Sequence, residues 1–124
     1  MILNWPQSDS EHLIVSSEQM QNIENEMFSM AMPVEALMEK VGIGISTVIL
    51  DSQGLIENGV IVLVRPGHNG GDGLVVAREL YLAGIDVSIW CAFPLKKELT
   101  QKHFDYAMQI KNISIMQCKL VLKT

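Results

Sequence analysis

The fold is decided by the stretch VIVLVRPGHNGGDGLVVA, residues 60–77. It begins with an unbroken aliphatic run, residues 60–64, which is typical of a strand buried on both of its faces. Four glycines follow within residues 67–73, and the apolar spacing of residues 74–83 then indicates a helix. Residues 85–92 form a second apolar run, so the stretch predicts a strand–helix–strand unit with parallel strands.

Further elements are predicted on both sides of this unit. Residues 16–19, Ser-Ser-Glu-Gln, read as a capping box that opens a helix ending near Phe28, and Pro33 is a favoured first residue for a second helix. Residues 104–110 suggest another helix and residues 113–116 a third strand. The alternation predicts a Rossmann-like α/β fold of three αβα layers around a mostly parallel sheet, which we expect to be incomplete at the C-terminus.

Composition narrows the classes of partner and location. The chain has 124 residues, of which 48% are hydrophobic, and a net charge of −5, so it can bury a core but offers no basic field for nucleic acid. Cys91 and Cys118 lack metal-ligand spacing and are expected to be free thiols. The first residues lack the basic segment, apolar run and cleavage site of a secretory leader, and no apolar stretch is long enough for a membrane, so we expect a cytoplasmic protein.

The glycine-rich segment 67–73 is the candidate ligand site. A strand that leads through glycines into a helix N-terminus presents backbone N–H groups and the positive end of the helix dipole at the sheet's carboxyl edge. Such an arrangement can hold a pyrophosphate without lysines. The alternative is that the glycines only form a tight connection between strand and helix.

Two standard phosphate-binding motifs do not fit this segment. A P-loop would end in Gly-Lys-Ser/Thr, whereas this segment ends Gly-Asp-Gly. The G-x-G-x-x-G dinucleotide fingerprint is also missed, because the glycines stand at positions 67, 70, 71 and 73. The segment therefore belongs to another variant.

Two segments carry a resemblance to a known family. His68-Asn69-Gly70-Gly71-Asp72-Gly73 after a strand, together with residues 33–42, PVEALMEKVG, resembles the NAD(P)H-hydrate epimerase family, whose domain is the YjeF N-terminal domain. The similarity extends over residues 16–115. It implies a Rossmann-like fold and an isomerase that interconverts the R and S hydrates of NADH and NADPH, which repairs the damaged cofactor.

The resemblance also implies roles for individual residues. His68, Asn69, Gly70, Gly71 and Asp72 would contact the hydrated dinucleotide, and the side-chain oxygen of Asn69 would bind a potassium ion. Hard monovalent cations prefer such oxygen ligands. Asp72 could bond a ligand hydroxyl or cap the following helix. His68 could be a hydrogen-bond donor, a proton shuttle or only a turn residue.

The sequence departs from the family pattern in two ways. Arg65 stands where the family usually has glycine, and its long cation could narrow the crevice or pair with a phosphate. The family's catalytic aspartate and remaining potassium ligands lie beyond the matched region, so no catalytic residue is assigned here. Asp86 and Asp105 follow no matching motif and are expected to be surface groups.

These observations divide the chain into an irregular lead-in, residues 1–15, a partial epimerase-like domain, residues 16–116, and an atypical tail, residues 117–124. Three interpretations stay open: an epimerase portion with doubtful activity alone, a non-catalytic module that binds a nucleotide or a protein, and a nonfunctional remnant. The expected ligand is hydrated NADH or NADPH, and the resemblance is compatible with a homodimer.

Overall fold

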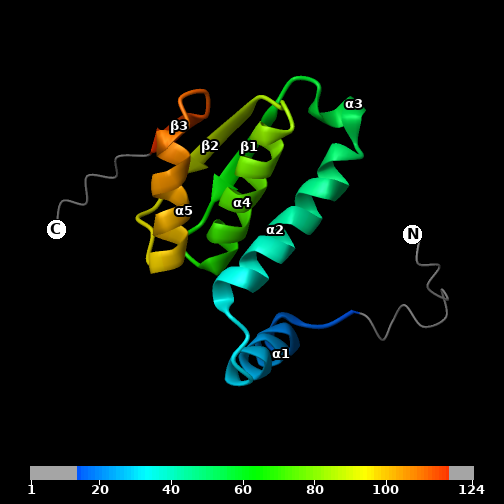
Figure 1. Ribbon diagram of the computed structural model, residues 1–124, viewed down its shortest axis with the longest axis vertical. Coiled ribbons are helices and arrows are strands. Elements are labelled where there is room, and N and C mark those ends of the chain that lie inside the picture. Colours follow the sequence, from blue (N-terminus) through cyan, green and yellow to red (C-terminus); the bar gives the residue numbers. More distant parts are fainter. Residues whose placement is uncertain (1–13, 118–124) are drawn as a thin grey trace. The chain divides into compact units, whose positions relative to one another are not determined.

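The computed structural model describes residues 14–117, which form five α-helices and three strands (Figure 1). They divide into two compact units, with the boundary between Val34 and Glu35. The elements in chain order are α1 (Ser17–Ser29), α2 (Val34–Leu50), α3 (Gln53–Ile56), β1 (Val60–Val64), α4 (His68–Leu82), β2 (Val87–Cys91), α5 (Glu98–Gln109) and β3 (Ser114–Gln117).

The first unit contains α1, and its capping box is present as predicted. Ser16 Oγ accepts a hydrogen bond from the Gln19 backbone N–H at 3.1 Å, and Gln19 Oε1 accepts one from the Ser16 N–H at 2.8 Å. These two bonds satisfy donors that a helix start otherwise leaves free. Ala31, with φ of +67°, ends the segment in the left-handed region, and α1 buries none of its residues within the described chain.

The second unit is built around a parallel sheet in the order β1-β2-β3. Val60 pairs with Val87 and Ser88 pairs with Ser114, so each strand lies beside the next one in the sequence. Helix α4 connects β1 to β2, and α5 connects β2 to β3. The predicted parallel α/β fold is confirmed, although the strand limits differ from the expected ones by up to two residues.

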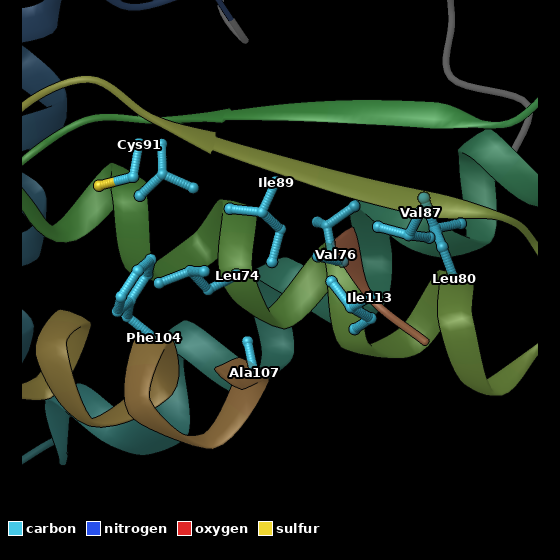
Figure 2. Packing of buried hydrophobic residues seen from close by; sticks show 11 residues of the cluster. Leu74, Val76, Leu80, Val87, Ile89, Cys91, Phe104, Ala107 and Ile113 are labelled. Carbon is cyan, nitrogen blue, oxygen red and sulfur yellow. The ribbon is translucent and has the colours of Figure 1, made fainter. Parts of the chain in front are cut away.

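The core lies between the sheet and helices α4 and α5 (Figure 2). Leu80 and Ile89 are completely buried, and burial of an aliphatic side chain of this size stabilises the fold by about 1.5–3 kcal/mol. The cluster consists of Val64, Leu74, Val76, Ala77, Leu80, Val87, Ile89, Cys91, Phe104, Ala107 and Ile113. Strands β1 and β2 therefore contribute the side chains of one face, and Ile115 of β3 packs against the same cluster.

Strand β1 corrects the sequence prediction that residues 60–64 are buried on both faces. Ile61 and Leu63 are 63% and 64% exposed, whereas Val64 is buried. The aliphatic run is continuous, but successive side chains point to opposite faces, and the helices of the described chain cover only one of them. The β-branched composition thus predicted the strand correctly, but it wrongly predicted that the second face of the strand is buried.

Helix α4 begins six residues earlier than predicted. The sequence placed residues 67–73 in a turn and began the helix at Leu74, but α4 starts at His68 and contains three of the glycines. Glycine inside a helix costs about 1 kcal/mol relative to alanine, which is why propensity disfavoured this assignment. Packing favours glycine at these positions, because a Cβ on Gly70 would collide with the Arg65 carbonyl and one on Gly71 with the Met38 side chain.

Helix α2 packs through a narrow line of small or flexible residues. Met38, Gly42 and Ser46 are buried at a spacing of four residues, and a Cβ on Gly42 would collide with Val75 of α4. Gly42 thus allows α2 to approach α4 closely. Several other apolar side chains of α2 are exposed, including Val48 at 67%.

The remaining predictions concern the cysteines, the termini and membranes. Cys91 is a buried free thiol whose Sγ donates to the Phe93 carbonyl at 3.3 Å, and burial raises the pKa of this thiol. Cys118, the lead-in up to residue 13 and the tail from residue 118 lie outside the described residues. No helix in the described part of the chain combines the length and apolar character needed to cross a bilayer.

Candidate functional site

The candidate site is the first turn of α4, which directly follows the carboxyl end of β1. Gly67 is the N-cap residue, in an extended conformation with φ of −81° and ψ of −171°. The side chains of His68 and Asn69 follow it and are exposed. This is the edge of a parallel sheet at which α/β folds bind ligands, and the α4 N-terminus adds a positive dipole end there.

The glycines of this turn serve packing more than ligand access. A Cβ on Gly70 would collide with the Arg65 carbonyl, and one on Gly71 would collide with the Met38 side chain. A Cβ on Gly73 would approach Val62 to 3.2 Å. Both Gly70 and Gly71 are buried. The alternative that these glycines bring strand and helix together therefore describes most of the motif.

Gly67 differs from the other three glycines. A Cβ built on it meets no atom of the described chain within 4 Å, so this end of the turn is open. The Gly67 carbonyl is nevertheless held in place, because it accepts the Gly70 N–H at 3.0 Å. One of the backbone donors that the sequence suggested for a ligand is therefore used within the turn itself.

The five residues predicted to contact the ligand fall into two groups. His68 and Asn69 are exposed on the first turn, whereas Gly70 and Gly71 lie beneath them. Asp72 is half-buried on the second turn, three residues after Asn69 and hence on a neighbouring part of the same helix face. The suggestion that Asp72 caps the helix is wrong, because the N-cap residue is Gly67.

Thr100 is a residue of the site that sequence reasoning missed. It lies on α5, is completely buried, and its Oγ1 donates a hydrogen bond to the Gly67 carbonyl at 3.1 Å. Beside it, the Lys96 backbone N–H donates to the Pro66 carbonyl at 3.4 Å. A signal existed in the sequence: Thr100 shares the buried face of α5 with Phe104 and Ala107, where a hydroxyl needs a partner.

A charged cluster connects three helices at some distance from this turn. Arg78 of α4 donates to both carboxylate oxygens of Glu39 on α2, at 2.8 and 2.5 Å, and to Glu79 at 2.8 Å. His103 Nε2 of α5 lies 3.9 Å from Glu39. Arg78 follows His68 by ten residues, or about 15 Å along a helix, so the cluster is separate from the candidate site.

The cluster shifts the titration of its members. The hydrogen bond from Arg78 lowers the pKa of the Glu39 carboxyl, despite some burial. The same hydrogen bond, seen from the guanidinium, raises the pKa of Arg78. Burial lowers the pKa of His103, Arg78 lowers it further, and Glu39 opposes both effects. We interpret the cluster as a clamp between helices, because its ion pair joins Arg78 of α4 to Glu39 of α2.

The two other aspartates considered in the sequence are exposed, as expected. Asp105 accepts a hydrogen bond from Gln101 at 2.8 Å, and the backbone carbonyl of Asp86 accepts the Val60 N–H at 2.8 Å. Within residues 14–117, no group of three or more His, Cys, Asp or Glu side chains could hold a metal ion. A potassium ion held by amide and carbonyl oxygens would not need such carboxylate, imidazole or thiol groups. The predicted potassium site at Asn69 therefore stays a prediction.

Comparison with known proteins gives a consistent result. The family described as "YjeF-related protein N-terminus" matches residues 34–119. The bifunctional NAD(P)H-hydrate repair enzyme Nnr of Gloeobacter violaceus is 48% identical over 94 residues, which are 75% of this chain and 18% of the relative. Its counterpart in Synechocystis is 48% identical over 98 residues, covering 78% and 19%.

A fungal relative and a solved structure extend the comparison. The NAD(P)H-hydrate epimerase of Sclerotinia sclerotiorum is 36% identical over 98 residues, covering 75% of this chain and 39% of the relative. The crystal structure of the yeast protein ynu0 (YNL200c) superposes with a TM-score of 0.74 at 25% identity, covering 84% of this chain and 46% of the yeast chain. This chain thus spans less than half of each of these relatives, and it belongs to the family of YjeF-related N-terminal domains.

Proposed function

We propose that this chain supplies the nucleotide-binding half of an NAD(P)H-hydrate epimerase. The observation that carries the proposal is the open first turn of α4, at the carboxyl end of β1, in a family whose curated relatives are named NAD(P)H-hydrate epimerase. The ligand would be the hydrated form of NADH or NADPH. The cellular role would be repair of that damaged cofactor in the cytoplasm.

Binding would use the exposed end of the turn. The pyrophosphate would lie at the N-terminus of α4, where the helix dipole favours negative charge, with His68 and Asn69 beside it. Asp72 would bond a ligand hydroxyl from the second turn. Gly70 and Gly71 would act through shape, because their buried positions fix where the first turn stands.

Arg65 adds a charge that the family pattern lacks. Its side chain is exposed between β1 and the turn, and a guanidinium can pair with two phosphate oxygens at once. We therefore propose that Arg65 makes phosphate binding tighter and also narrows the entrance to the ligand crevice.

Epimerisation needs a group that assists departure and return of the hydroxyl on the hydrated ring, which is general acid–base work. No carboxylate among the described residues is assigned that role. We expect the purified chain to bind nucleotide without measurably interconverting the two hydrates. Chromatography of R and S NADPH hydrate checks this, and enzyme-dependent equilibration by the chain alone would contradict it.

Binding itself can be measured by calorimetry with NADPH as the probe. We expect His68→Ala to weaken binding, whereas His103→Ala, an imidazole in the helix clamp, serves as the matched control. Equal affinity of wild type and His68→Ala would count against the turn as the ligand site. Absence of any binding by wild type would count against the proposed function.

The donor chemistry of Asn69 fits the potassium ion that the resemblance implies. Its amide oxygen and the Asp72 carboxylate are hard ligands three residues apart on one helix, where such pairs are neighbours. The α4 N-terminus is itself unfavourable for a cation, so the ion would need the negative charge of Asp72 or of a bound phosphate. When bound, potassium would supply charge neutralisation for that phosphate.

Thermal melts in matched potassium and sodium chloride series test the ion site. A ligand at a hundredfold excess over its Kd stabilises by about 2.7 kcal/mol, so even a weak site becomes visible at high concentration. We expect wild type to prefer potassium and Asn69→Ala to lose that preference, whereas Asn58→Ala, an exposed asparagine elsewhere, keeps it. Equal responses to both salts in wild type would contradict the site, because general screening does not distinguish the two ions.

A further inference from the structure

Two segments of the chain meet at the carboxyl edge of the sheet. Strands β1 and β2 end in register, because Val64 pairs with Cys91, so the segments that follow them leave the sheet side by side. The Lys96 backbone N–H donates to the Pro66 carbonyl at 3.4 Å and joins the two segments. Helices α4 and α5 begin at this same end of the sheet (Figure 1). Residues 92–97, which follow β2, therefore lie beside the first turn of α4, the proposed pyrophosphate site.

The segment after β2 carries cations and no carboxylate. Its sequence, residues 92–97, is Ala-Phe-Pro-Leu-Lys-Lys, and both Lys96 and Lys97 are exposed. Within residues 14–117, neither of these ammonium groups forms an ion pair, whereas Lys102 on α5 lies 3.5 Å from Glu98. Two cations that lack a carboxylate partner in the described chain thus stand next to the first turn of α4.

Lys97 occupies a position where lysine does not favour the fold. It is the N-cap residue of α5, and no side-chain hydrogen bond caps the helix there. Serine, threonine or aspartate would supply such a bond, and a cation is unfavourable at the positive end of the helix dipole. Residues that break local rules of this kind are expected at functional sites. The position of Lys97 therefore favours a role toward an anionic ligand over a role in stability.

The place of this segment in the fold indicates which part of a dinucleotide it would meet. In α/β domains that bind dinucleotides, the pyrophosphate lies at the start of the helix after the glycine turn, and a residue about 20 positions further on reads the adenine ribose. A carboxylate there binds the 2′-hydroxyl of NAD, whereas a cation accommodates the 2′-phosphate of NADP. Phe93, which is 54% exposed directly after β2, offers a flat ring on which an adenine can stack.

We propose that Lys96 and Lys97 form a subsite for the 2′-phosphate of the adenine ribose, so that this chain prefers the hydrate of NADPH to that of NADH. The inference rests on the proposed function and names the form of the dinucleotide that the site takes. NADH has a hydroxyl in place of this phosphate and leaves both ammonium groups without a partner. Arg65, which follows β1, would act on the pyrophosphate that the two dinucleotides share, so it would not distinguish them.

Calorimetry of the 124-residue chain with NADPH and with NADH tests the subsite. We expect NADPH to bind at least about tenfold more tightly, which is the gain typical of one hydrogen bond to a charged group. The double substitution Lys96→Gln and Lys97→Gln should bring the two affinities together by weakening NADPH alone. Arg65→Gln should weaken both ligands equally. Lys111→Gln, the same charge change at an exposed position beyond the other end of α5, should alter neither affinity.

Lys97→Ser separates the subsite from a role in stability. Serine can cap α5, so we expect the Tm to rise by roughly 4 °C in a thermal melt. The preference for NADPH should fall in the same variant. A lysine with only a structural role would leave the ratio of the two affinities unchanged, and that result would count against the subsite.

The smaller probes adenosine 2′,5′-bisphosphate and ADP separate failure of the subsite from failure of the proposed function. Equal binding of NADPH and NADH by wild type, or equal weakening of both by the lysine substitutions, overturns the subsite and leaves the proposed function standing. Lysine-dependent preference for the bisphosphate over ADP, without binding of either dinucleotide, supports the subsite and counts against the proposed function. Absence of binding by all four probes overturns both.

Discussion

The two sides of the first turn of α4 use glycine in opposite ways. On the inner side, Gly70 and Gly71 are buried against the Arg65 carbonyl, Met38 and Thr100. On the outer side, Gly67 faces open space and the exposed side chains of His68 and Asn69 follow. A glycine-rich motif is therefore not a single ligand-binding feature, because most of its glycines here position the helix and only its tip is accessible.

The largest expected effect separates the two sides by substitution with alanine. Gly70→Ala places a Cβ on the Arg65 backbone carbonyl, which no side-chain rotation can relieve, so we expect a loss at the upper end of the roughly 1–3 kcal/mol typical of overpacking. Gly67→Ala should cost less than about 1 kcal/mol, since its backbone angles suit alanine. Urea unfolding of both variants measures these losses, and equal losses would show that the two glycines do not differ in their packing role.

Thr100 extends the comparison from the backbone to the side chain that holds it. Thr100→Val keeps the shape but removes the hydroxyl that donates to Gly67, so we expect a loss of about 1–2 kcal/mol in unfolding free energy. Thr47→Val is the matched control, because the Thr47 hydroxyl also donates to a carbonyl, that of Ile43, but on an exposed surface. A Thr100→Val loss no larger than that of the control would show that the contact is incidental.

The smallest expected effect concerns the helix clamp, which lies outside both sides of the turn. Because Arg78 lowers the pKa of Glu39 in the folded state, this carboxylate stabilises the fold above its ordinary pKa of 4.5, and that contribution is lost as pH falls through the lowered value. Exposure limits it to about 0.5–1 kcal/mol. Glu39→Gln should therefore flatten the stability curve below pH 4.5.

The titration of His103 also lowers the stability of the fold as pH falls, but at a higher pH than that of Glu39. Its lowered pKa means that protonation opposes folding, so stability is full above the ordinary value of 6.5 and declines as pH falls toward the folded value. His103→Gln should remove the decline just below pH 6.5 and leave the Glu39 step in place. Identical curves for wild type and Glu39→Gln, measured by urea unfolding from pH 3 to 7, would contradict the assignment of the lower step.

The sequence predicted the parts of the fold that depend on local pattern. The capping box at Ser16 and the parallel strands around α4 follow from short-range spacing, and both are present. The start of α4 at His68 could not be predicted, because it depends on contacts with Met38 and Thr100 that lie about 30 residues away in either direction. The face of β1 that stays open also depends on where helices pack, which composition does not encode.

The candidate site follows the same division. Its place after β1 was predictable from the strand and the glycines, and the family resemblance supplied the roles proposed for His68 and Asn69. The hydrogen bond from Thr100 to the Gly67 carbonyl was not predictable, because a threonine on a helix face has many explanations until the structure shows its partner. Contacts between residues distant in sequence thus account for most of what the sequence left open.

The pairing of each strand with its neighbour in sequence also bears on synthesis. Val60 meets Val87, twenty-seven residues later, and Ser88 meets Ser114, twenty-six residues later. A ribosome adds such a length in about 1 to 5 seconds, whereas short loops close in well under a millisecond. Each strand can therefore join the sheet as soon as it leaves the exit tunnel, and the sheet grows in the order in which its residues are translated.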